Sequence, residues 1–81
     1  MTVKARLRDC FAAVFPSAAP GELEQASVYT IADWDSLATV RLVAVVEEEF
    51  EVVFELEDLE HLNSFERVYQ RLEARLAGGH R

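Results

Sequence analysis

The chain has 81 residues, 51% of them hydrophobic, with three glycines, two prolines and one cysteine. This length allows a single domain, the apolar content argues against a disordered tail, and so few turn residues argue against a many-stranded β-domain. The net charge is −7, and residues 9–60 hold thirteen acidic residues against one basic residue, Arg41. This charge argues against nucleic acid and anionic membranes as partners and favours a partner protein with a basic patch.

The first half of the chain is expected to hold one helix and a long connection. Val3, Leu7 and Phe11 are spaced to share one helical face, which predicts a helix over residues 2–15 that Pro16 stops. Residues 16–34 are expected to connect it to the next helix, with a short helical turn at 22–25. A connection this long in a small domain is often functional.

The second helix is expected over residues 36–50, because Asp35 is a good N-cap for the apolar run that follows. Further apolar residues widen its stripe well beyond a normal amphipathic face, so the helix is apolar nearly all round in its middle. That composition predicts either a central place in a bundle or a face turned to a ligand or partner. The residues assigned to the core stripe are Leu37, Val40, Val43, Ala44 and Phe50.

The rest of the chain is expected to hold a short helix and a final long one. Residues 55–62 fit a short third helix, although residues 52–56 fit a strand equally well. The last helix is expected over residues 64–77, with Asn63 and Glu66 as a capping box. Two glycines end it, and residues 78–81 are expected to form a flexible tail.

These elements together predict one all-α domain over residues 1–81. It is a small four-helix bundle of three longer helices and one short helix, with a long loop between the first and second helices. The lone Cys10 cannot form an internal disulfide. No apolar run reaches transmembrane length, and the six-residue run after Asp9 is too short for the apolar core of a secretory signal. A cytoplasmic, monomeric protein is expected.

Catalytic machinery is not expected in this chain. Its neutral-pH bases are His61, in an acidic and exposed segment, and His80, in the glycine-rich tail. The sequence has no metal-spaced His/Cys set, no phosphate-cradling glycine loop and no nucleophile elbow. We therefore expect no enzyme activity and no metal site.

The informative segment is Asp33-Trp34-Asp35-Ser36-Leu37, which leads directly into the second helix. Ser36 is predicted to be the first helical residue after an Asp cap. A phosphate ester on its oxygen would lie beside the free amides and the positive end of the helix dipole. Taken alone, three common residues in a row predict no more than the start of a helix.

The longer run DSLATVRLVAVVEEEFEV, residues 35–52, resembles the second helix of acyl carrier proteins. The resemblance includes Asp35-Ser36-Leu37 and the triple acid Glu47–Glu49. The long preceding loop, the acidic segment at 55–60 and the capped last helix follow in the order and spacing of that family. The resemblance therefore covers nearly the whole chain.

The resemblance implies that the protein is a carrier and not an enzyme. Ser36 would receive 4′-phosphopantetheine from coenzyme A through a separate Mg²⁺-dependent phosphopantetheinyl transferase, and the arm would carry an acyl group as a thioester. Acyl-loading and acyl-transfer enzymes with basic docking patches would be the partners. The residues that match partner recognition in the family are Asp35, Leu37, Glu47 and Glu48, and those that match the lining of an acyl cavity are Val40, Val46, Phe54 and Leu62.

Three positions depart from the commonest pattern of the family. Many members have glycine where this chain has Trp34, and fatty-acid carriers often have acids where it has Ala38 and Arg41. These departures favour a carrier dedicated to one lipid or secondary-metabolite pathway, and an aminoacyl carrier is an alternative. A second alternative is an acidic helical interaction module that is never modified. A third is a small hydrolase or isomerase that depends on His61.

Overall fold

The computed structural model describes residues 2–78, which form a helical bundle. The predicted all-α fold is confirmed, and no strand forms within residues 2–78, so the strand alternative for residues 52–56 is wrong. No helix in this range is long and apolar enough to cross a membrane. The elements are helix α1 (Val3–Val14), the 3-10 helix η1 (Pro20–Gln25), and helices α2 (Ser36–Phe50), α3 (Leu56–Leu59) and α4 (Phe65–Gly78).

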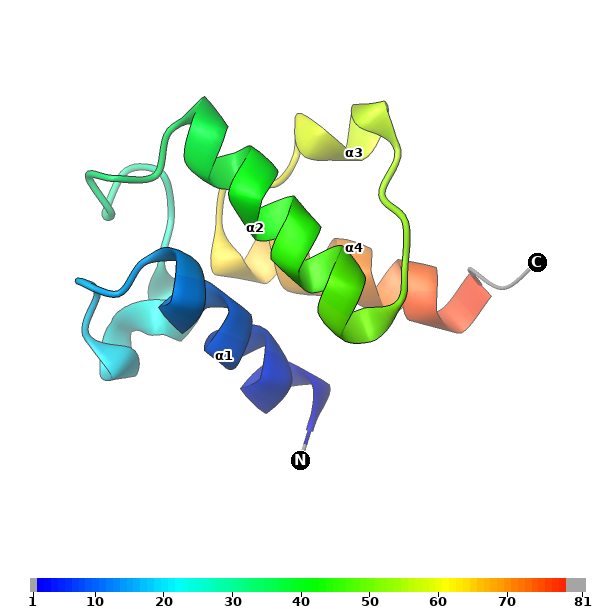
Figure 1. Ribbon diagram of the computed structural model, residues 1–81, viewed down its shortest axis with the longest axis horizontal. Helices are drawn as coiled ribbons and strands as arrows, with labels where there is room; N and C mark the ends of the chain where they lie inside the picture. The colour runs from blue at the N-terminus through cyan, green and yellow to red at the C-terminus, as the bar shows by residue number, and fades with distance from the viewer. Residues whose placement is uncertain (1, 79–81) are drawn as a thin grey trace.

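Helices α1 and α2 run side by side in opposite directions, and α4 lies behind them (Figure 1). Arg6 of α1 joins the far end of α2, because its guanidinium donates to the side chain and the backbone carbonyl of Glu49, both at 2.9 Å. The long connection between α1 and α2 is pinned to the start of α4. There the N–H of Val28 donates to the carbonyl of Asn63, and the N–H of Phe65 donates to the carbonyl of Ala26.

An aromatic cluster forms the part of the core nearest the start of α2. The ring of Phe11 lies 4.9 Å from Phe65 and 5.5 Å from Trp34, and Phe15 lies 5.2 Å from Trp34, measured between ring centres. The rest of the core is mostly aliphatic and comes mainly from α1, α2 and α4, with Phe50 and Phe54 as its aromatic members. Its fully buried members are Leu7, Leu42, Val46, Val68 and Leu72.

The core face of α2 differs from the predicted one. Leu37 and Val40 are 59% and 56% exposed, and Ala44 is also exposed, whereas Val43 is half-buried and Phe50 is buried as predicted. Because α2 is apolar on more than one side, its sequence period does not decide which side meets α1. The buried side is the row with a spacing of four, Ala38, Leu42, Val46 and Phe50.

The ends of the helices follow local capping chemistry. Asp35 caps α2 as predicted. The predicted Asn63–Glu66 capping box is wrong, because Ser64 is the residue whose Oγ accepts from the N–H of Arg67 at 3.1 Å. The carbonyl of Asn63 instead accepts from the N–H of Val28, in the connection before α2. Gly78 is the last residue of α4, so the predicted tail does not begin there, and its remaining residues, 79–81, lie outside the described residues.

Candidate functional site

The N-terminus of α2 presents Ser36 to solvent. Asp35 has an extended backbone, and its Oδ1 accepts from the N–H of Ala38 at 2.9 Å, which starts the helix at Ser36. Ser36 is exposed and is the first residue of a 15-residue helix. The first-turn N–H groups of a helix lack carbonyl partners within it. The hydroxyl therefore lies at the positive end of the helix dipole.

Trp34 anchors the chain two residues before Ser36. Its indole is buried against Phe11 and Phe15, and its Nε1–H donates to Thr39 Oγ1 at 2.9 Å. Thr39 in turn donates to the carbonyl of Asp35 at 3.2 Å. Trp34 is therefore part of the core that fixes the start of α2, and its ring is not part of an exposed surface.

The outer face of α2 carries apolar and charged side chains beyond Ser36. Leu37, predicted to contact partners, is exposed, and the helical spacing places Arg41, Ala44 and Glu48 on the same side, all of them exposed. Val40 is also exposed and stands apart from the other three residues predicted to line a cavity. Those three, Val46, Phe54 and Leu62, are buried in one cluster.

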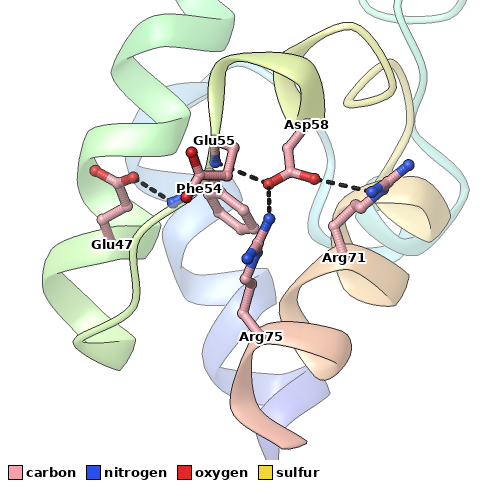
Figure 2. Close-up of polar contacts among 6 residues, drawn as sticks. All are labelled: Glu47, Phe54, Glu55, Asp58, Arg71 and Arg75. Carbon is pink, nitrogen blue, oxygen red and sulfur yellow. Dashed lines mark hydrogen bonds and ion pairs between the residues drawn. The ribbon is translucent and has the colours of Figure 1, made fainter. Parts of the chain in front are cut away.

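The structure separates the two glutamates predicted to recognise partners. Glu48 is exposed on α2. Glu47 is half-buried, and its Oε2 accepts from the N–H of Phe54 at 2.8 Å, which holds the chain that follows α2 (Figure 2). Glu47 therefore has a structural role, whereas the side chain of Glu48 is exposed to solvent.

Asp58 is a buried charged residue that the sequence did not single out. Its carboxylate accepts from the N–H of Glu55 at 2.8 Å, from Arg71 at 2.8 Å and from Arg75 at 2.6 Å (Figure 2). Burial acts to raise the pKa of Asp58, but the Glu55 N–H and the two guanidinium groups outweigh it and hold that pKa below its ordinary value. The available signal was the spacing of four between Arg71 and Arg75, which places both on one face of α4.

Cys10 and His61 are the cysteine and the histidine within residues 2–78. Cys10 is buried, and its burial, with the nearby acids Glu49 and Asp9, raises the pKa of the thiol to about 11. His61 is exposed, and His80 lies outside the described residues. Within residues 2–78, no group of three or more His, Cys, Asp or Glu side chains is placed to hold a metal ion.

No protein-family model matches the chain, and no curated protein matches it either. Its function is therefore inferred from the sequence pattern and from the geometry at the start of α2. That geometry offers the exposed Ser36 hydroxyl at a capped helix terminus, beside exposed apolar and charged side chains.

Proposed function

We propose that the chain is a carrier protein with an acyl-carrier-type bundle, which bears 4′-phosphopantetheine on Ser36. The observation that carries the proposal is the exposed Ser36 at the first position of α2, directly after the Asp35 cap and two residues after the buried Trp34. This arrangement fixes the backbone at the attachment point and leaves the hydroxyl free for another enzyme to reach.

The residues present fit a phosphodiester at Ser36. The linkage carries a negative charge, which the free amides and dipole at the start of α2 stabilise. In the attachment step, Ser36 Oγ attacks the phosphorus of coenzyme A that bears the pantetheine. The new P–O bond forms as the pyrophosphate P–O bond breaks, adenosine 3′,5′-bisphosphate leaves, and the serine proton passes to a base on the transferase. When bound, the arm supplies a thiol that carries an acyl group as a thioester.

Partner enzymes would dock on the outer face of α2. Asp35 and Glu48 offer negative charge there, and Leu37 offers an apolar contact next to the attachment point. Arg41 lies on the same face and interrupts the acidic surface. This mixed surface supports a carrier that serves a dedicated lipid or secondary-metabolite pathway.

The test is intact-protein mass spectrometry after incubation with coenzyme A, Mg²⁺ and a broad-specificity phosphopantetheinyl transferase. The parent chain should gain the mass of one phosphopantetheine, and Ser36→Ala should gain none. Ser17→Ala is the matched control, because Ser17 is another exposed serine, and this variant should be modified like the parent. Ser36→Ala should fold normally, since a change at an exposed helix start costs about 1 kcal/mol or less.

Two outcomes would contradict the proposal. The first is no mass gain in the parent with several transferases, which would favour an unmodified acidic interaction module. The second is equal modification of the parent and Ser36→Ala, which would place the arm elsewhere.

A further inference from the structure

The segment between α2 and α4, residues 51–62, is named the strap here, and it begins at a strained residue. Glu51 ends α2 with φ 57° and ψ 46°, and it is the one non-glycine residue with a positive φ within residues 2–78. Residues other than glycine carry a Cβ, which disfavours this left-handed region. The chain direction at the end of α2 is therefore set by a backbone conformation that the rest of the strap has to maintain.

The strap is attached to the bundle by polar contacts on two sides (Figure 2). On the α2 side, Glu47 accepts from the N–H of Phe54. On the α4 side, Asp58 accepts from Arg71 and Arg75. Helix α3 within the strap has only four residues, and a helix this short is not stable on its own. Its position therefore depends on these contacts and on the apolar residues that the strap places in the core.

The strap has apolar side chains on both of its sides. Phe54 and Leu62 point inward and are buried in the core with Val46. Val53 and Leu56 point outward and are 71% and 84% exposed. The strap thus covers part of the core with one set of side chains while it offers the other set to solvent.

The Asp58 contact is the stronger polar attachment, and it is open to solvent on one side. The carboxylate is fully buried, so the loss of either arginine leaves it less compensated. The side chains of Arg71 and Arg75 are 40% and 31% exposed. A surface pocket of about 150 Å³ borders the contact and is lined by Asp58, Arg71, Ala74, Arg75 and Gly78. Solvent therefore reaches the arginine side of the pair while the rest of the bundle stays packed.

We propose that the strap opens as a unit about Glu51, and that the Asp58–Arg71/Arg75 contact is the latch that keeps it closed. Opening withdraws Phe54 and Leu62 from the core and uncovers the apolar interior on that side, while α1, α2 and α4 stay folded. Asp58 is a positioning residue in this device, because it acts through the placement of the strap. For the carrier proposed above, the latch would set how an apolar cargo reaches the interior, and that consequence rests on the proposed function.

Amide hydrogen exchange on the full, unmodified chain tests the latch. Asp58→Asn should speed exchange of the strap amides by at least about tenfold, the change that loss of a charge-assisted hydrogen bond produces. Amides of α1 and α2 should keep their exchange rates. The matched control is Glu57→Gln, because Glu57 is the exposed acid next to Asp58 in α3, and it should change nothing. The amides that report on the strap are those of Phe54, Asp58, His61 and Leu62.

The buried thiol of Cys10 on α1 separates opening of the strap from unfolding of the domain. Its reaction rate with a thiol reagent should stay unchanged in Asp58→Asn. Arg75→Gln is a milder variant that keeps the Arg71 contact, and it should give a smaller increase confined to the strap. Two results would overturn the proposal. The first is exchange that rises equally in all helices, together with faster Cys10 labelling in both variants. The second is unchanged exchange of the strap amides. Neither readout requires modification of Ser36, so this test can fail while the carrier proposal stands.

Discussion

Replacement of Trp34 should destabilise the domain more than any surface change, because its indole joins the connection before α2 to the core. A buried aromatic side chain removes about 150–250 Å² from water, which corresponds to about 4–6 kcal/mol at 25 cal/mol per Å². Large-to-small changes of this kind cost about 3–5 kcal/mol, and an 81-residue domain has a free energy of unfolding of about 4–12 kcal/mol in total. Trp34→Ala should therefore lower the free energy of unfolding by about 3–5 kcal/mol and leave a domain of marginal stability.

Urea unfolding followed by far-UV circular dichroism measures this loss without relying on the tryptophan itself. Trp34→Phe keeps an aromatic ring but loses the Nε1–H that donates to Thr39, and Thr39→Val removes the acceptor. A double-mutant cycle of the two should give a coupling energy of about 1 kcal/mol. Tyr29→Ala is the control, since Tyr29 is 90% exposed in the same connection and should change stability by less than about 0.5 kcal/mol. A cost below about 1 kcal/mol for Trp34→Ala would refute the anchoring role.

Three further predictions concern the strap and its contacts. Glu47→Ala should lower the free energy of unfolding by about 1–2 kcal/mol, because it leaves the Phe54 N–H unpaired. Glu48→Ala should lower it by less than about 0.5 kcal/mol. Equal losses for the two variants in urea unfolding would contradict the different roles of the two glutamates. Glu51→Gly should stabilise the chain by about 0.5–1 kcal/mol, since glycine adopts the left-handed conformation without strain; a lower urea midpoint would argue against that backbone. The pKa of Asp58 is lower in the folded chain than its ordinary value of 3.8. The ionised carboxylate therefore contributes its full stabilisation of the fold above pH 3.8, and this stabilisation is lost as the pH falls through the pKa of the folded state. The acid limb of a Tm–pH profile should therefore be shallower in Asp58→Asn, and superimposable limbs would refute this.

Local signals were sufficient to predict where α2 begins and ends. Asp35 supplies the capping oxygen, and the observed helix runs over the predicted residues 36–50. The α1 and α4 boundaries are also predicted to within one residue of the observed ones, because Pro16 and the glycines at 78 and 79 mark them. These features depend on neighbours in the sequence, so the sequence alone predicts them.

Features that depend on distant residues were not predictable in this way. The apolar residues of α2 cover more than one face, so contact with α1, and not the helical period, selects Ala38 for the core and leaves Leu37 in solvent. Asp58 is one acid among many in residues 47–60, and only the packing of α3 against α4 distinguishes it. Glu47 and Glu48 look alike in the sequence, and they differ only because the strap returns past one of them.

The three residues at the start of α2 would allow the proposed carrier to combine a stable core with an accessible attachment point. Trp34 points into the aromatic cluster, the carboxylate of Asp35 accepts from the N–H of Ala38, and Ser36 faces solvent. Glycine at position 34 would allow more backbone conformations, so the direction of a group attached at Ser36 would be less restricted. With Trp34 the backbone before Ser36 is held by burial, so in the proposed carrier the mobility would have to come from the attached arm and from the strap. Under the two proposals, presentation of the arm would depend on the start of α2, and access to the core would depend on the latched strap.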